Sequence, residues 1–87
     1  MNVETPEHRL KRMQMRANRR GTKEMDLVLG PFAKAHLARM DAPGLDLFDA
    51  LLSENDQDLY QWVTGQVKCT PQYTDLIDEI AVHAGLT

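Results

Sequence analysis

Apolar residues recur at intervals of three and four along most of the chain, which is the spacing of one face of an α-helix. The repeats predict five helices, over about residues 6–18, 22–40, 45–53, 55–65 and 70–83. The second segment has the broadest apolar arc and is predicted to be the central core helix; its arc consists of Met25, Val28, Leu29, Phe32, Ala33, His36 and Met40. The alternating apolar and polar positions of a half-buried strand are absent from the sequence. The pattern therefore predicts an all-α fold, a compact bundle of five short helices.

The other four predicted helices each have a narrower apolar stripe. The residues expected to point inward are Leu10, Met13 and Ala17, then Leu45, Phe48, Leu51 and Leu52, then Leu59, Trp62 and Val63, and finally Tyr73, Leu76, Ile77 and Ile80. Trp62 is assigned mainly to the core, with Tyr60 at the edge of its helix.

Helix caps and breakers support these boundaries. Thr5 before Pro6, and Thr70 before Pro71, are typical of helix N-termini, and Asn55 or Asp56 can cap the fourth helix. Residues 41–44, Asp-Ala-Pro-Gly, predict a turn, and Gly65 predicts the end of the fourth helix. Pro31 interrupts the second segment, but the apolar arc keeps its phase on both sides. We therefore expect the second helix to be kinked at Pro31 and to continue beyond it.

The length and composition indicate one small domain. The 87 residues, of which 43% are hydrophobic, provide for a single core over 1–87. One cysteine, Cys69, excludes an intrachain disulfide and favours a reducing compartment. No apolar run approaches the roughly 18 residues of a membrane span, and the N-terminal residues resemble neither a secretory signal nor a transit peptide. We expect a soluble, cytoplasmic protein of a bacterium.

Charge is distributed unevenly along the chain. Residues 1–24 have seven basic and three acidic side chains, whereas the remainder has three basic and ten acidic ones, and the net charge is −3. The basic residues of the first helix form an arginine ridge made of Arg9, Arg12, Arg16, Arg19 and Arg20. This ridge could be a solvated face, or it could meet an anionic partner or the acidic remainder of its own molecule. The overall acidity argues against nucleic acid as the default partner.

The stretch Arg20-Gly21-Thr22-Lys23-Glu24 lies where the first helix should end and the second begin. Gly21 can take the left-handed conformation that closes a helix. Arg19 and Arg20 fall at the negative end of the first helix dipole, and Glu24 falls in the first turn of the second, where an anion is favoured. Taken alone, these charges could serve only to terminate the helices.

Sequence motifs of the common active sites are absent. The chain has no Walker loop, no GxGxxG fingerprint, and no HExxH, CxxC or GxSxG motif. His8, His36 and His83 fall on different predicted helices, His36 is interpreted as a structural residue, and Cys69 has no neighbouring histidine. The aspartates at 56, 58, 75 and 78 and Glu79 are interpreted as helix caps or solvated charges. We therefore predict a binding protein with no catalytic and no metal-binding residues.

The charged stretch and a second landmark resemble a known family. Arg20, Gly21 and Glu24 match an RGxxE signature, Met25-Asp26 follows it, and Trp62-Val63-Thr64-Gly65 matches a weaker landmark. The combination is similar to the small SdhE-type proteins, the succinate dehydrogenase assembly factor 2 family, over about residues 9–81. One departure is that Met13 and Met15 stand where the family often has an aromatic residue before the position of Arg16. Methionine can fill the same space with less rigidity, so the departure bears on packing.

This resemblance implies a function. The family promotes covalent attachment of FAD to the flavoprotein subunit of succinate dehydrogenase or fumarate reductase. It implies that Arg20, Gly21 and Glu24 contact that subunit, with Arg16, Arg19 and Asp26 as the next candidates. Such a protein would bind no cofactor tightly and act on the FAD of its partner. From the residues themselves we also expect no membrane insertion and a monomer, since nothing in the sequence marks a dedicated dimer interface. A domain of this size also has little room for a pocket that encloses FAD.

Three other interpretations remain open from the sequence. The main one is an antitoxin-like or regulatory protein–protein interaction module that uses the same arginine ridge. The second is nucleic-acid binding through the first helix, although its arginines lack interleaved aromatic residues. The third is a small flavin-binding enzyme, which should copurify yellow.

Overall fold

Helices account for nearly all of the regular structure in the computed structural model, which describes residues 4–86. In chain order they are α1 (Pro6–Asn18), α2 (Lys23–His36), α3 (Ala42–Leu51), α4 (Asp56–Val63) and α5 (Thr74–His83). Two 3₁₀ turns lie between them, η1 (Leu37–Arg39) and η2 (Pro71–Tyr73). No strand occurs in this part of the chain, so the predicted all-α bundle of five short helices is confirmed.

Side-chain caps explain where four of the helices begin. Thr5 accepts a hydrogen bond from the backbone N–H of His8 at 3.2 Å, and Thr22 accepts one from Met25 at 3.3 Å. Asn55 caps α4 in the same way, accepting from Gln57 at 2.7 Å. These bonds satisfy amide groups that have no partner inside the helix. The predicted starts of α1, α2 and α4 are therefore confirmed.

The third helix begins three residues earlier than predicted. The Asp41 carboxylate accepts from the Gly44 N–H at 2.8 Å, which makes Asp41 the N-cap of a helix that already includes residues 42–44. Pro43 is tolerated there because the first turn needs no amide donor from it. The prediction of a separate turn over 41–44 was therefore wrong. The same helix ends at Leu51 and not at Ser53. The backbone amides of Ser53 and Glu54 donate to carbonyls three residues earlier, which is the pattern of a 3₁₀ turn and not of an α-helix.

Three other boundaries differ in detail. Helix α2 ends at His36, and the segment predicted to continue it to residue 39 or 40 tightens into η1, a frequent ending for a helix. The segment predicted to begin the fifth helix first forms η2 over residues 71–73, and α5 begins at Thr74. Helix α4 ends at Val63, and Gly65 takes a positive φ of 78°, as expected of a glycine that follows a helix end.

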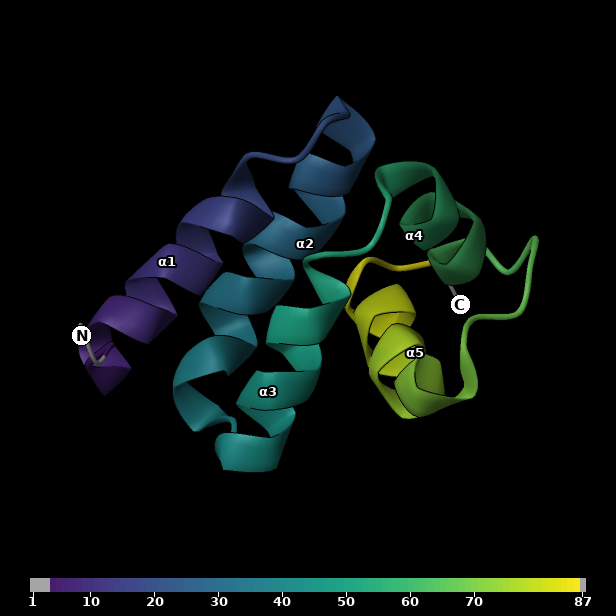
Figure 1. The fold of residues 1–87 in the computed structure, drawn as a ribbon. Helices are drawn as coiled ribbons and strands as arrows, with labels where there is room; N and C mark the ends of the chain where they lie inside the picture. Colours follow the sequence, from purple (N-terminus) through teal and green to yellow (C-terminus); the bar gives the residue numbers. More distant parts are fainter. Residues whose placement is uncertain (1–3, 87) are drawn as a thin grey trace.

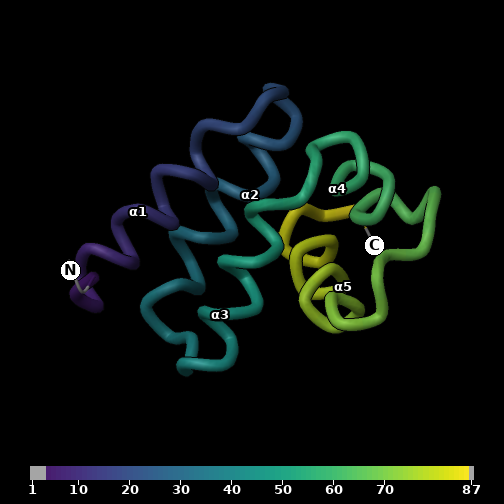
Figure 2. Tube along the Cα trace, in the orientation of Figure 1, coloured from purple at the N-terminus to yellow at the C-terminus, as the bar shows by residue number. Residues whose placement is uncertain are grey.

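Helices α1 and α2 form an antiparallel pair, and α3 returns alongside α2 (Figure 1). The short helices α4 and α5 lie together on the other side of α2, and the turn between α1 and α2 lies near the start of α4 (Figures 1 and 2). The molecule is elongated, with extents of 41 × 25 × 22 Å. Two segments far apart in sequence, residues 19–24 and the start of α4, are thereby brought together.

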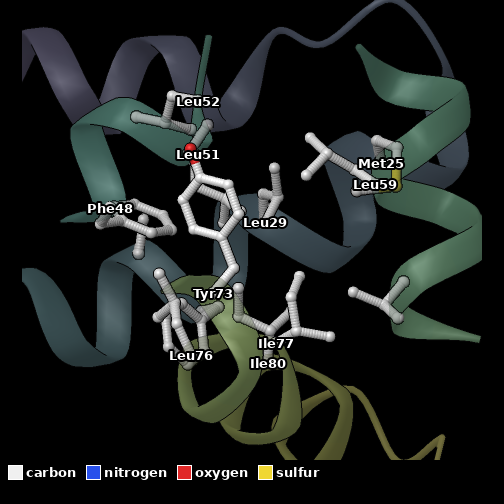
Figure 3. Packing of buried hydrophobic residues seen from close by; sticks show 14 of the residues in the cluster. Met25, Leu29, Phe48, Leu51, Leu52, Leu59, Tyr73, Leu76, Ile77 and Ile80 are labelled. Carbon is white, nitrogen blue, oxygen red and sulfur yellow. The ribbon is translucent and has the colours of Figure 1, made fainter. Parts of the chain in front are cut away.

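One apolar core runs between these helices. Tyr73 lies near its centre, with Phe48 and Leu29 beside its ring, and Met25 meets Leu59 at the α2–α4 contact (Figure 3). The residues predicted to point inward are buried or packed against the core, and Trp62 is among those partly buried at its edge. Met13 is fully buried whereas Met15 is 53% exposed, so only the first of the two methionines fills core space.

Helix α2 continues through Pro31, as predicted; the kink itself stays a prediction. The preceding glycine has a packing role, because a β-carbon at Gly30 would lie 2.7 Å from the side-chain oxygen of Asn18. Gln14 donates to the Gly30 carbonyl at 3.1 Å. Gly30 therefore permits α1 to approach α2 closely.

Candidate functional site

The signature turn, defined as residues 19–24, joins α1 to α2 on the surface beside α4. Two local hydrogen bonds hold its ends. The backbone N–H of Arg20 donates to the Asp26 carboxylate, and Thr22 caps α2. Asp26 lies in the first turn of α2, where the helix dipole favours its negative charge. The turn is thus tied to the helix that follows it.

A second carboxylate, from α4, fixes the turn on its other side. Asp56 is the first residue of α4; its Oδ1 accepts from Nε of Arg20 at 2.8 Å, and its Oδ2 accepts from the Gly21 N–H at 2.5 Å. Both bonds involve a charged group, which makes them stronger than neutral ones. We call this arrangement the Asp56 clamp.

The side chain of Arg20 is used within the molecule. Besides Asp56, its guanidinium donates to the Leu52 carbonyl at 2.7 Å and to the Glu54 carbonyl at 3.1 Å. All three of its nitrogens are therefore bonded, and the side chain is only 8% exposed. These bonds join the turn to the segment that links α3 to α4. The guanidinium of Arg20, which the family resemblance assigned to partner contact, faces this segment in the structure.

Gly21 is needed for space and not for an unusual backbone angle. Within residues 4–86, only Gly65 and Gly85 have a positive φ, so the expectation of a left-handed Gly21 was wrong. A β-carbon at this position would lie 2.8 Å from Oδ2 of Asp56. The close approach of the carboxylate, made possible by the hydrogen bond to the Gly21 amide, is the physical reason for the glycine.

The outer face of the turn is exposed. Arg19 and Glu24 are both exposed, and neither side chain forms a hydrogen bond or ion pair within the described residues. Glu24 borders a surface groove between the start of α2 and α4, which is lined by Thr22, Glu24, Asp56, Gln57, Asp58, Tyr60, Gln61 and Gln66. The groove is therefore polar, with three carboxylates and one partly exposed aromatic ring.

The rest of the arginine ridge meets the acids of α3. Arg9 donates to Asp46 at 2.6 Å, and Arg12 donates to both oxygens of Asp49 at 2.9 and 2.7 Å. Arg16 lies 3.5 Å from Asp49 and donates to the Leu52 carbonyl at 3.0 Å. The sequence left open whether the ridge faces solvent, a partner or its own molecule. In the structure, four of its five arginines contact their own molecule. We call Arg9, Arg12, Arg16 and Arg20 the arginine row.

The ion pairs of the arginine row shift the pKa values of the arginines and of the carboxylates that they bind. Hydrogen bonding from Arg12 lowers the pKa of Asp49 and also that of Glu4 below their usual values. The carboxylates in turn raise the pKa of Arg12, and the bond to Asp46 raises the pKa of Arg9. Each shift favours the charged forms, as expected for opposite charges in contact.

The six residues singled out from the sequence therefore divide into two groups. Gly21, Glu24 and Arg19 are exposed at the turn, whereas Arg20, Arg16 and Asp26 are half-buried and bonded within the molecule. Arg16 and Arg20 share one acceptor, the carbonyl of Leu52. The residue that sequence reasoning missed is Asp56, which it treated as a cap or solvated charge. Only its position in the first turn of α4 was visible, because its partners lie 35 and 36 positions away.

His36 and His83 come from different helices, and their rings lie close together. His36 stacks on Phe32 with ring centroids 4.4 Å apart, and the His83 ring meets His36 at 5.4 Å, a contact that the sequence did not predict. In residues 4–86 no group of three His, Cys, Asp or Glu side chains is arranged to hold a metal ion. No helix in the described range is long and apolar enough to cross a membrane.

Together, these features define a small all-α domain whose charged signature lies in one turn that is fixed from two helices. A sequence model of the family described as "flavinator of succinate dehydrogenase" matches residues 11–84. The chain therefore belongs to the succinate dehydrogenase flavinator family, and the resemblance seen in the sequence is confirmed.

Curated relatives carry a consistent name, "Succinate dehydrogenase assembly factor 2, mitochondrial". The protein of Candida glabrata is 45% identical over 60 residues, covering 69% of this chain and 39% of the relative. The protein of Meyerozyma guilliermondii is 41% identical over 68 residues, 78% of this chain and 50% of its own length. The Drosophila grimshawi protein is 35% identical over 78 residues, 86% of this chain and 53% of its own length. The chain thus spans about half the length, or less, of these relatives.

Proposed function

We propose that this protein is an assembly factor that binds the flavoprotein subunit of succinate dehydrogenase, or of fumarate reductase, and promotes covalent attachment of FAD to it. Membership of the succinate dehydrogenase flavinator family supports the proposed role in FAD attachment. The structural observation that supports the site is the exposed, unpaired carboxylate of Glu24 on a turn held by Asp26 and Asp56. A fixed backbone presents this charge at low entropic cost, which favours binding.

The proposed role is to position the partner and not to supply a catalytic group. Preferential binding to one arrangement of the flavoprotein would raise the population of that arrangement, and alignment of the flavin with its attachment residue would then lower the barrier. The groove beside the turn carries Glu24, Asp56 and Asp58, whose charges are unfavourable for the pyrophosphate of FAD. This acidic lining supports a protein that acts on the FAD of its partner and binds none tightly itself.

The partner-binding region that we propose comprises Arg16, Arg19, Arg20, Gly21, Glu24 and Asp26. Glu24 and Arg19 are exposed, and in this proposal they contact the partner directly, with the Gly21 backbone between them permitting close approach. Arg20, Arg16 and Asp26 support this surface through their internal bonds. A small polar contact of this kind suits a transient complex that must dissociate after assembly.

The test is covalent flavin fluorescence of the denatured flavoprotein subunit, measured without this protein, with it, and with its Glu24→Ala variant. We expect a clear gain with the wild type and a loss of most of that gain with the variant. Glu79→Ala is the matched control, because Glu79 is an exposed carboxylate on α5, outside the groove. Equal flavinylation in all samples would contradict the proposed function, and equal loss in both variants would contradict the proposed site.

Location and oligomeric state are part of the proposal. We propose that the protein acts as a monomer in the cytoplasm. The curated relatives are named mitochondrial, so the compartment is best tested directly, by fractionating cells that express the protein at its natural level.

A further inference from the structure

We infer that Asp56 is a positioning residue for partner binding, which acts through Arg20 and Gly21 to fix the direction in which Glu24 is presented. The inference rests on the proposed function and adds a residue that lies outside the RGxxE signature. It also assigns Arg20 to the inner support of the turn.

The first step is that both oxygens of the Asp56 carboxylate accept a hydrogen bond from the turn. One oxygen accepts from the Arg20 side chain and the other from the Gly21 amide, so the two bonds hold both the side chain and the backbone of the turn. The Asp56 side chain is 17% exposed, which leaves little of it for an incoming protein. A role in binding must therefore be exerted through the groups that it holds.

The second step is that the clamp sets the relative position of two walls of the groove. Thr22 and Glu24, at the start of α2, form one wall, and Tyr60 and Gln61, on α4, form the other. Asp56 belongs to α4 and bonds to the residues immediately before Thr22. Without the clamp, the turn would stay tied to α2 by Asp26 and to the α3–α4 segment by the two carbonyl bonds of Arg20, but it would lose its hydrogen bonds to α4 itself.

The third step is that only a carboxylate of this length satisfies both donors. Asparagine has nearly the same shape, but its amide nitrogen is a donor and would face either the Gly21 N–H or the Arg20 guanidinium. Asp56→Asn therefore removes one half of the clamp with minimal change in volume. Asp58→Asn is the matched control, since Asp58 lies on the same helix and lines the same groove without holding the turn.

The experiment is a double-mutant cycle on the affinity for the isolated flavoprotein subunit, using Asp56→Asn, Glu24→Ala and the pair. We expect Asp56→Asn to weaken binding about tenfold, and to weaken it less than twofold when Glu24 is already replaced, because a positioning residue acts through the group it positions. Asp58→Asn should have a smaller effect than Asp56→Asn. Equal, additive losses in both backgrounds would show that Asp56 contacts the partner itself and would overturn the inference.

A second measurement tests the clamp in the isolated protein. The Gly21 amide proton, bonded to a carboxylate, should resonate downfield in the NMR spectrum of the wild type and move upfield in Asp56→Asn, while the helical circular dichroism is retained. An unchanged Gly21 resonance would overturn the clamp irrespective of any partner. A wild-type protein that fails to bind the flavoprotein, with the Gly21 shift as expected, would instead overturn the proposed function and the role of Asp56 in it.

Discussion

Gly21 illustrates how a single residue can be predicted as important for the wrong physical reason. The sequence indicated a helix end that needs a left-handed backbone, whereas the structure shows an ordinary φ and a carboxylate in the space that a β-carbon would occupy. Gly30 follows the same principle, with the Asn18 side chain as its close neighbour. In both cases the neighbour comes from another helix, so the local sequence could not reveal it.

A substitution at Gly21 should therefore depend on Asp56. We expect Gly21→Ala to lower the free energy of unfolding by about 1–2 kcal/mol, since the added methyl displaces the carboxylate and disturbs its bonds. In an Asp56→Ala background the same change should be nearly neutral. Urea unfolding of the four proteins measures the coupling, and equal effects of Gly21→Ala in both backgrounds would contradict this explanation.

Tyr73 is a second residue that the sequence described only in part, because it fills core space and also forms a hydrogen bond. Its ring is 1% exposed, and its hydroxyl donates to the Glu54 carboxylate at 2.9 Å. Burial, and then the bond to Glu54, raise the pKa of Tyr73 above its ordinary value. The sequence predicted that Tyr73 points inward but gave no sign of its bonding partner.

This raised pKa has a consequence at alkaline pH. Above about pH 10 the tyrosine ionises more readily in the unfolded chain than in the folded one, so stability should fall as the pH rises through that range. Tyr73→Phe should lower the free energy of unfolding by about 1 kcal/mol at neutral pH, because the hydrogen bond to Glu54 is missing. Its free energy of unfolding should also fall less steeply as the pH rises above about 10. Unfolding monitored by circular dichroism between pH 7 and 11 tests both expectations; parallel pH profiles would argue against Tyr73 as the source.

At the scale of helices, the arginine row fastens α1 to α3. The sequence predicted the ridge of arginines from its helical spacing but left its counterpart open. The structure identifies the counterpart as Asp46 and Asp49 of α3, together with carbonyls after its end. These pairs depend on how α3 folds back along α2, which no local pattern specifies. The early start of α3 was readable in principle, because Asp41 and Pro43 are together typical of an N-terminus.

Asp49 is the central acceptor of the row, and its removal should weaken the α1–α3 contact. We expect Asp49→Asn to destabilise the protein by about 1 kcal/mol at neutral pH and low salt, a value reduced by the partial exposure of its arginine partners. Because the pKa of Asp49 is lowered in the folded state, its contribution should be present above about pH 4 and lost as the pH falls through the folded pKa. The difference between wild type and variant should therefore shrink at low pH.

Urea unfolding at pH 7 and pH 3, each at low and high salt, measures this difference. Asp46→Asn is the control, since Asp46 is 69% exposed and pairs only with Arg9 in the described structure. It should have the smaller effect. An Asp49→Asn penalty that is independent of both pH and salt would indicate a packing effect in place of the ion pairs.

For the molecule as a whole, internal pairing changes what the charge distribution means. Most of the basic ridge of α1 is neutralised by α3, and the groove beside the signature turn is lined by acids. The sequence could predict the net charge and the single helical domain, and the family resemblance pointed to the turn at residues 19–24 as the contact region. The sequence left open whether the basic and acidic parts of the chain face each other or meet other molecules.

This arrangement predicts weak binding to nucleic acids. We expect no mobility shift of a short DNA duplex or single-stranded RNA at about 150 mM salt, because few arginines remain free to displace counterions from phosphates. Asp49→Asn should increase any binding seen at low salt, since it releases positive charge on α1. A wild-type shift that persists at the higher salt would favour the nucleic-acid interpretation.

The arginine row also bears on the lifetime of the folded state. Helices α1 and α2 are adjacent in the sequence, whereas the arginine row joins residues 32 to 37 positions apart. Contacts that close long loops tend to form late in folding. Asp49→Asn should therefore speed unfolding about fivefold and leave the refolding rate nearly unchanged, as stopped-flow measurements in urea can show. Slower refolding of the variant would instead show that the row forms in the folding transition state. If only unfolding is faster, these ion pairs determine how long a folded molecule persists and have little influence on how fast it forms.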